Sequence, residues 1–201
     1  MLIFDSHTHI FPDKVAERAL EHLRHLAHEL PTFTQGTAVS QEATAFRYGY
    51  TGWMNCPVVT NEHQMRSVND WVAGLNHWPH LSLGGIFPNA PMAVVLEEIH
   101  RIKKLGLYGI KFHPEYQGFR PLDPKFDPMW QAMRDEELPA FFHAGADVAY
   151  FSQEQNSWPH YCLRPSRWLA ELGPRGVRPV RGTGLPGHRF RQMLDARPGA
   201  I

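Results

Sequence analysis

Residues 109–114 read Gly109-Ile110-Lys111-Phe112-His113-Pro114, and this stretch has the pattern of one strand of a parallel barrel. Side chains alternate between the two faces of a strand, so Lys111 and His113 share one face while Ile110 and Phe112 share the other. A barrel strand places its apolar face against helices and its polar face toward the barrel mouth. We therefore take Lys111 and His113 as candidate catalytic residues. The alternative for Lys111 is a lysine at the barrel rim whose amine reaches water.

Similar apolar runs recur along the chain and alternate with helical patterns. The periodicity predicts five strands, at residues 2–9, 54–59, 81–87, 107–113 and 139–143. Helices are predicted between them: one from Pro12 with an apolar stripe from Val15 to Leu30, one capped by Asn61, one closed by Gly106 and one opened by Asp127. Such alternation means parallel strands joined by right-handed crossovers, hence an α/β fold that is either a TIM-like (β/α)8 barrel or a doubly wound sheet. The barrel is favoured because polar residues gather at the carboxyl ends of the strands.

Two histidines close the first predicted strand, in the run Leu2-Ile3-Phe4-Asp5-Ser6-His7-Thr8-His9. Because side chains two apart on a strand point the same way, His7 and His9 present both imidazoles from one rigid element. Imidazole is the commonest neutral ligand of zinc, and Asp5 shares the same face, where it is placed to orient one ring. With thirteen histidines in the chain, a chance His-x-His spacing is the alternative. The position at a strand's carboxyl end favours a metal site.

A third histidine ends the fifth predicted strand. His143 precedes Ala144 and Gly145, two small residues that leave room for a ligand. A catalytic zinc site needs about three protein ligands and an open position. We therefore predict that His7, His9 and His143 bind a divalent metal, with zinc as the first choice and manganese or iron as alternatives.

Composition excludes several classes of partner. Twenty lysines and arginines balance twenty aspartates and glutamates among 201 residues, and no basic run stands out, so no nucleic acid or membrane surface is expected as a partner. No stretch approaches the ~20 apolar residues of a membrane span, and a first strand that starts at residue 1 or 2 leaves no room for a signal peptide. A cytoplasmic protein with a small-molecule substrate is expected, and a homo-oligomer is compatible with the sequence.

Three motifs, taken together, resemble the amidohydrolase superfamily, and specifically its amidohydrolase-related branch of metal-dependent hydrolases and decarboxylases. They are Asp5-Ser6-His7-Thr8-His9, then Gly109-Ile110-Lys111-Phe112-His113-Pro114-Glu115-Tyr116-Gln117, then Phe142-His143-Ala144-Gly145. The resemblance covers roughly residues 1 to 163 and implies a TIM-like (β/α)8 barrel with a divalent metal at its mouth, held by His7, His9 and His143. It also places Lys111 where members with two metals carry a carboxylated lysine.

The activity that the resemblance implies is hydrolysis of a C-N or C-O bond in a small carbonyl compound. In that mechanism the cation lowers the pKa of a water and polarises the carbonyl, while a carboxylate moves the proton. In the family this carboxylate is an aspartate after strand eight, and a further histidine follows strand six; neither is recognisable in this sequence. Two other interpretations stay open: a metal-dependent non-oxidative decarboxylase, and an inactive truncated remnant that at most binds metal.

Two arginines are candidates for holding a substrate carboxylate. Arg47 lies in the segment 32–52, which shows no clear period and could cover the mouth of a barrel, and Arg120 follows the fourth predicted strand.

Composition changes after the fifth strand. Residues 164–201 contain eight arginines, five prolines, six glycines and no lysine, and proline or glycine interrupts every apolar run. Eight βα units need about 250 residues, so the barrel is predicted to be truncated after about five units. We expect two regions: a partial barrel over residues 1–163 and an aberrant tail over 164–201, which is either out of frame or naturally disordered.

Overall fold

The computed structural model describes residues 3–143. Its strands are β1 (Phe4–Thr8), β2 (Gly52–Asn55), β3 (His80–Ser82), β4 (Gly84–Gly85), β5 (Ile110–Phe112) and β6 (Ala140–Phe142). Its α-helices are α1 (Asp13–Leu26), α2 (Ala38–Arg47), α3 (Glu62–Leu75), α4 (Met92–Lys104), α5 (Pro114–Gln117) and α6 (Asp127–Asp135). A short 3-10 helix, η1 (Pro124–Phe126), precedes α6. The alternation of strand and helix agrees with the periodicity, except that α2 and α5 are helices that the periodicity does not predict.

All paired strands of the described chain are parallel, in two three-stranded groups ordered β1-β2-β3 and β4-β5-β6. The groups join because β3 and β4 are two halves of one run separated by Leu83. The amide of Leu83 donates to Asn55 on one side at 3.0 Å, while the amide of Gly84 donates to Gly109 on the other at 2.8 Å. The run therefore exchanges β2 for β5 as its partner, and the strands follow one another in sequence order around one curved arc. This confirms a parallel α/β fold.

The strand boundaries differ from those predicted. The second strand covers residues 52–55 rather than 54–59, because the amide of Cys56 makes one last bond to Thr8 (2.8 Å) and the next residue, Pro57, has no N–H to donate. Val59 lies instead in the core beneath the helices. The predicted strand over 81–87 is the split run β3 and β4, and the strands predicted over 107–113 and 139–143 shorten to β5 and β6.

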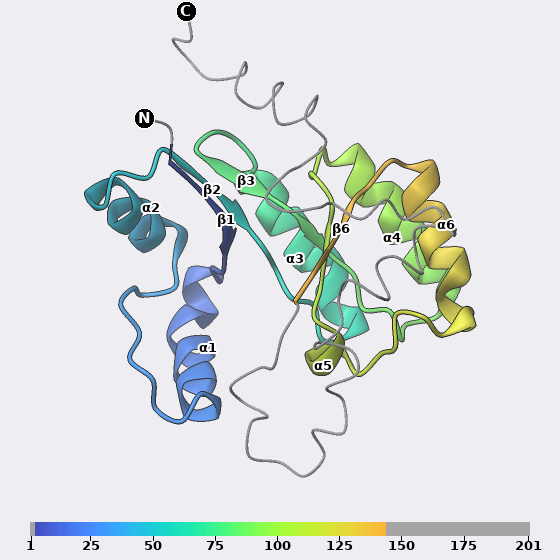
Figure 1. Cartoon of the computed structure of the whole chain (residues 1–201), viewed down its shortest axis with the longest axis horizontal. Coiled ribbons are helices and arrows are strands. Elements are labelled where there is room, and N and C mark those ends of the chain that lie inside the picture. The colour runs from blue at the N-terminus through green and yellow to red at the C-terminus, as the bar shows by residue number, and fades with distance from the viewer. Residues whose placement is uncertain (1–2, 144–201) are drawn as a thin grey trace, which may run out of the picture.

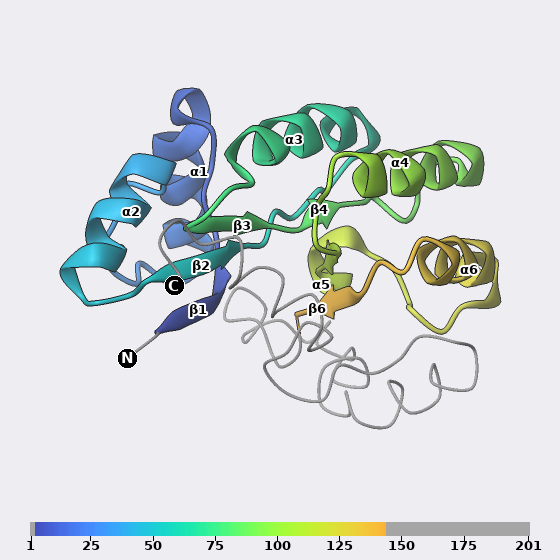
Figure 2. The same ribbon diagram turned by 90° about the horizontal axis from the view of Figure 1, so that it is seen from above.

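The main hydrophobic core lies between the sheet and helices α3, α4 and α6 (Figure 2). Ile110 and Phe112 of β5 belong to this core, together with Trp130 and Met133 of α6. The intervening residue Lys111 pairs in register with Phe141, which packs in a second, smaller cluster on the other face of the sheet. The predicted alternation along β5 is confirmed: its apolar side chains face the helices, and its lysine faces the inside of the arc.

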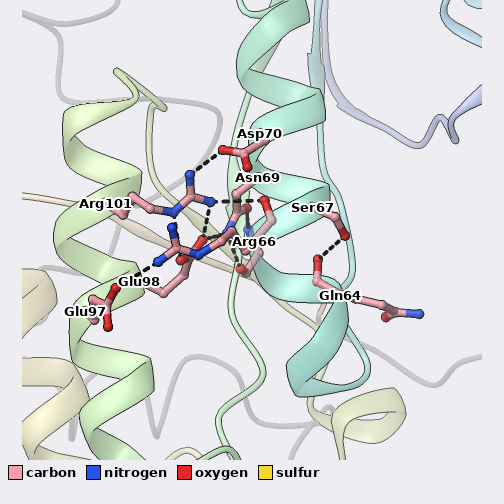
Figure 3. A network of polar contacts seen from close by, with 9 residues as sticks. Gln64, Arg66, Ser67, Asn69, Asp70, Glu97, Glu98 and Arg101 are labelled. Carbon is pink, nitrogen blue, oxygen red and sulfur yellow. Dashed lines mark hydrogen bonds and ion pairs between the residues drawn. The ribbon is translucent and has the colours of Figure 1, made fainter.

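A buried polar network fastens α3, α4 and the sheet to one another (Figure 3). Asn69 of α3 accepts from the amide of Gly85 (2.8 Å) and donates to the carbonyl of the same residue (2.9 Å) and to Glu98 of α4 (2.6 Å). Arg101 of α4 donates to Glu98 and forms an ion pair with Asp70 of α3. These bonds hold the outer helices against β4.

The first helix differs from its prediction. It ends at Leu26 rather than at Leu30, because the chain turns away with a positive φ of 52° at His28. The predicted inner stripe is also wrong at both ends: Val15 is 39% exposed and Leu30 is 54% exposed. The buried residue of α1 is Ala16, one position from the expected face.

The segment 32–52, expected to be irregular, contains helix α2. Thr37 begins this helix, since its side chain accepts a hydrogen bond from the amide of Ser40 at 3.2 Å. Threonine, a preferred N-cap residue, was the local signal for it. Apolar periodicity fails as a guide because no residue of α2 is buried.

The carboxyl ends of the strands define one edge of the arc, called here the carboxyl edge. In Figure 1 the strands run downward, with α5 at their lower, carboxyl ends and α2 near the upper ends of β1 and β2. No helix among residues 3–143 is long and apolar enough to cross a membrane. The predicted domain boundary at residue 163 and the tail 164–201 lie outside the described residues.

Candidate active site

Lys111 is the buried ionisable residue at the centre of the candidate site. Its side chain is 1% exposed, and Nζ lies 2.8 Å from Nε2 of His7. Burial lowers the pKa of the amine, because the charged form loses its water. The rim-lysine alternative, in which the amine reaches solvent, does not fit this placement. The structure brings Lys111 and His7 into direct contact from strands that are far apart in the sequence.

His7 and His9 lie together at the carboxyl end of β1. Their ring centroids are 5.0 Å apart. The register of β1 against β2 shifts between Asp5 and Thr8, so His7 lies in an irregularity of the ladder, and its amide donates to the Asp5 carboxylate at 3.1 Å. Such bulges re-aim side chains next to functional sites. Both imidazoles therefore come from one short segment, as the His-x-His spacing predicts.

His113 lies in a stack of three rings at the carboxyl end of β5. It is parallel to Tyr116 (centroids 4.0 Å apart, planes at 6°) and to His143 (4.1 Å, 12°). Its Nδ1 accepts from the amide of Tyr116 at 3.4 Å, so His113 caps the short helix α5. A ring nitrogen that accepts carries no proton, which leaves Nε2 as the protonated nitrogen of a neutral ring. The cap and the stack fix the orientation of the imidazole.

Burial and neighbouring charges favour the neutral form of three imidazoles of the site, those of His7, His9 and His113. Burial lowers the pKa of His113 to about 3, and the next cause is the repulsion that a protonated His113 would meet from a protonated His143. Loss of hydration is the main cause that lowers the pKa of His9 to about 4, and the charge of Lys111 is the second. The same two causes, in the same order, lower the pKa of His7. A neutral imidazole is the form that binds a metal ion. These rings are therefore in the ligating form at neutral pH.

A metal fits the described part of the site only in part. The donor chemistry of His7 and His9 suits zinc or manganese, and both rings come from one rigid segment. Among residues 3–143, however, no group of three or more His, Cys, Asp or Glu side chains is arranged to hold a metal ion. His143 stacks on His113 instead of completing a triad with His7 and His9. The role of His143 as the third ligand stays a prediction.

The two candidate substrate arginines lie in different places. Arg47 is the last residue of α2 and exposed, with its guanidinium 5.9 Å from the ring of Tyr48. Thr51, four residues on, bonds to Ile3, so the chain after α2 enters at the amino ends of β1 and β2. The structure therefore does not bring Arg47 to the histidines. Arg120 is exposed in the loop after α5, on the side of the carboxyl edge.

Two residues of the site were missed by sequence reasoning. Cys56 is 1% exposed at the end of β2, and burial raises the pKa of its thiol to about 11, so it stays protonated beside Lys111. Gln117 is 2% exposed and bonds three separate loops. The sequence signal for Gln117 is weak, because a glutamine next to a glycine is usual in an exposed turn.

Comparison with known proteins assigns this arrangement to a family. The family model described as Amidohydrolase matches residues 4–172. The chain belongs to the amidohydrolase family. No curated protein sequence matches it. The predicted resemblance is confirmed, and the family match extends past the described residues into the arginine-rich region.

Solved structures similar to this amidohydrolase include several decarboxylases. They are 5-carboxyvanillate decarboxylase from Sphingomonas paucimobilis (TM-score 0.60, 16% identity, 88% of this chain and 65% of that one), the same enzyme from Novosphingobium aromaticivorans with manganese and 4-hydroxy-3-methoxy-5-nitrobenzoic acid (0.58, 15%, 88% and 56%), and 2,6-dihydroxybenzoate decarboxylase from Rhizobium (0.51, 18%, 84% and 55%). At these identities the likeness shows a shared fold and nothing more. The similar structures are TIM-like barrels, and the described arc of parallel strands corresponds to part of one. The chain spans less than two thirds of the length of each.

Proposed function

We propose that this chain supplies the first ligands of a divalent-metal site in an enzyme that acts on a small carbonyl compound. The observation that carries the proposal is the meeting of His7, His9 and Lys111 at the carboxyl edge, where the mouth of a parallel barrel collects its chemistry. Family membership supports it independently. His143, predicted as the third ligand, is close enough to interact electrostatically with His7 and His9, since repulsion between protonated rings contributes to lowering the pKa of both.

Each described residue has a role that follows from its contacts. His7 and His9 would hold the metal, which supplies a Lewis acid that polarises a carbonyl and acidifies water. Lys111 donates to or accepts from His7 Nε2 according to its protonation, so it adjusts the basicity of that nitrogen. His113 is a neutral ring whose Nδ1 accepts in the α5 cap, so the cap fixes the direction in which this imidazole faces the carboxyl edge.

Hydrolysis of a C-N or C-O bond is the first form of the proposal, because the family is described as amidohydrolase. Non-oxidative decarboxylation is the second, and the decarboxylases among the similar structures support it. Manganese in one of those structures makes this ion a candidate beside zinc. A small-molecule substrate, a homo-oligomer and a substrate contact by Arg120 remain predictions.

The test is metal binding by the full chain, measured by calorimetric titration with Mn²⁺ and with Zn²⁺. We expect His7→Ala and His9→Ala each to weaken binding by more than about 100-fold, beyond the 10- to 100-fold typical of a lost outer contact. His25→Ala, an exposed histidine of α1, is the matched control and should bind as the parent does. Binding by the parent that neither His7→Ala nor His9→Ala weakens would contradict the proposal.

A second measurement separates the two reactions. Metal-loaded protein is given a panel of esters, lactones and amides on one side and aromatic or enoic carboxylic acids on the other. Acid release from the first panel identifies a hydrolase, and carbon dioxide release from the second identifies a decarboxylase. Metal binding without turnover in either panel favours the third interpretation, a remnant that binds metal only.

A further inference from the structure

We propose that Gln117 is the positioning residue of this site, which ties three loops of the carboxyl edge together and thereby sets the place of His113. The proposal rests on the proposed function, since it gives a purpose to the position of His113. It concerns a side chain that touches neither of the candidate ligands His7 and His9.

The carboxamide of Gln117 makes three hydrogen bonds to the loops around it, one as an acceptor and two as a donor. Its Oε1 accepts from the amide of His113 at 2.8 Å. Its Nε2 donates to the carbonyl of Val59 at 2.8 Å and to that of Ile86 at 2.7 Å. The side chain is 2% exposed, so these bonds form away from water, where leaving one partner unsatisfied costs about 1–3 kcal/mol.

The three partners come from three neighbouring parts of the sheet. Val59 follows β2, Ile86 follows β4 and His113 follows β5, each just past the carboxyl end of its strand. Strand bonding has stopped at these points, so the carboxamide takes over the pairing of backbone groups where the strands separate into loops. Gln117 itself ends α5, which lies at this edge in Figure 1.

A second amide supports the first. Asn89, in the loop between β4 and α4, donates from Nδ2 to the backbone carbonyls of Gln117 (3.0 Å) and Gly118 (3.2 Å). The loop that Gln117 holds through Ile86 therefore holds Gln117 in return. Both ends of α5 are fixed: the His113 ring caps its first turn, and Asn89 binds its last residue.

The consequence for the site is a fixed imidazole. The hydrogen bond from the His113 amide to Gln117 fixes the position of the His113 backbone. The imidazole attached to that backbone stacks between the rings of Tyr116 and His143. Without the carboxamide, three carbonyl or amide groups lose their partner together, and the loops after β2, β4 and β5 are free to separate.

The experiment compares Gln117→Met, which keeps the length of the side chain and removes its polar atoms, with Asn76→Ala. Asn76 is a matched control because its amide also joins two backbone segments, accepting from Ser82 (2.9 Å) and donating to Gly106 (3.1 Å) away from the carboxyl edge. The first readout is the NMR shift of the His113 ring protons, which two stacked rings move upfield. The second is the dissociation constant for Mn²⁺.

We expect Gln117→Met to lose the upfield shift and to raise the Mn²⁺ dissociation constant about tenfold or more, while Asn76→Ala changes neither. An upfield shift retained in Gln117→Met, or lost equally in Asn76→Ala, would overturn the proposal. If the parent binds no metal, the metal proposal fails on its own, and the ring shift still decides the role of Gln117. Should Gln117→Met not fold, Asn89→Ala takes its place, and an unchanged His113 shift there overturns the proposal.

Discussion

Lys111 shows at the scale of one residue how this chain places chemistry inside its fold. A lysine amine enclosed by protein has lost its hydration, and its contact is the imidazole nitrogen of His7 rather than a carboxylate. Such a placement favours the neutral amine and does little for stability. A residue kept at that cost, in an arc otherwise lined by Met54, Leu81 and Phe141, is better explained by the site than by the core.

Replacing Lys111 by methionine should therefore leave the free energy of unfolding at pH 7 unchanged or raise it by about 1 kcal/mol. The amine keeps its proton to about pH 10.4 in the unfolded chain and loses it at lower pH in the folded one, so raising the pH stabilises the parent. Urea denaturation at pH 7 and at about pH 10, just below the pKa of the unfolded chain, should show this gain in the parent and not in Lys111→Met. Lys14→Met, at an exposed position of α1, is the control. A loss above about 2 kcal/mol in Lys111→Met at both pH values would contradict this explanation.

At the scale of elements, the polar network of α3 and α4 decides how the helical layer meets the sheet (Figure 3). Asn69 is fully buried and bonds both backbone groups of Gly85, which pairs in register with Lys111. Glu98 is balanced by Arg101, and hydrogen bonds from Arg101 to Glu98 raise the pKa of that arginine above its ordinary value. Asn69 thus connects the layer of helices to β4, the strand that pairs with Lys111 of β5.

Asn69→Ala should lower the free energy of unfolding by about 2–3 kcal/mol, because it leaves the amide and carbonyl of Gly85 without their side-chain partner in a buried place. Urea denaturation followed by circular dichroism measures the loss. Ser67→Ala, on the exposed face of the same helix, should stay within about 0.5 kcal/mol of the parent. Equal losses in the two variants would show that helix propensity, and not the buried network, sets the effect.

At the scale of the whole molecule, the buried imidazole of His113 makes stability depend on pH. Burial lowers the pKa of His113 to about 3 in the folded chain, against an ordinary histidine pKa of 6.5. Below about pH 6.5 a histidine of the unfolded chain binds a proton, while the same histidine in the folded chain stays neutral. Stability is therefore present above that pH and is lost as the pH falls toward the folded values.

We expect the free energy of unfolding to fall by a few kcal/mol between about pH 7 and pH 4, at roughly 1.4 kcal/mol for each pKa unit of a buried histidine. His113→Asn should make the dependence shallower, since asparagine keeps an acceptor for the α5 cap and does not titrate. His25→Asn, at an exposed position, should keep the parent's slope. Urea denaturation at several pH values measures the slopes, and a parent whose stability is flat or rises toward pH 4 would contradict the expectation.

Sequence reasoning succeeded where one local cause controls an element. Asn61 caps α3, and its side chain accepts from the amide of Gln64 at 3.1 Å as the pattern predicts. Trp130 and Met133 of α6 lie in the core, and Gly106 follows α4 with a positive φ of 73°. Caps, glycine turns and apolar stripes act over a few residues, so they can be recognised in the sequence.

It failed where the environment of an element decides its state. Helix α2 buries none of its residues, so no apolar stripe announces it, and it is held to the sheet by Glu42 and His80 at 3.1 Å. His80 in turn accepts from the indole of Trp53 at 2.8 Å. These partners are separated by up to 38 residues, and no local pattern connects them.

The sequence by itself determined the family, the parallel α/β fold and the face of β5 on which Lys111 lies, because strand alternation and motif order are local properties of the chain. Only the tertiary structure decided which of these side chains meet. It brought Lys111 into contact with His7, stacked His143 on His113 and put Arg47 just before the amino end of β2, where Thr51 bonds to Ile3. The physical reason is that contacts between strands depend on register and loop path, and these are fixed by buried bonds such as those of Gln117, whose partners lie 58 and 31 residues away.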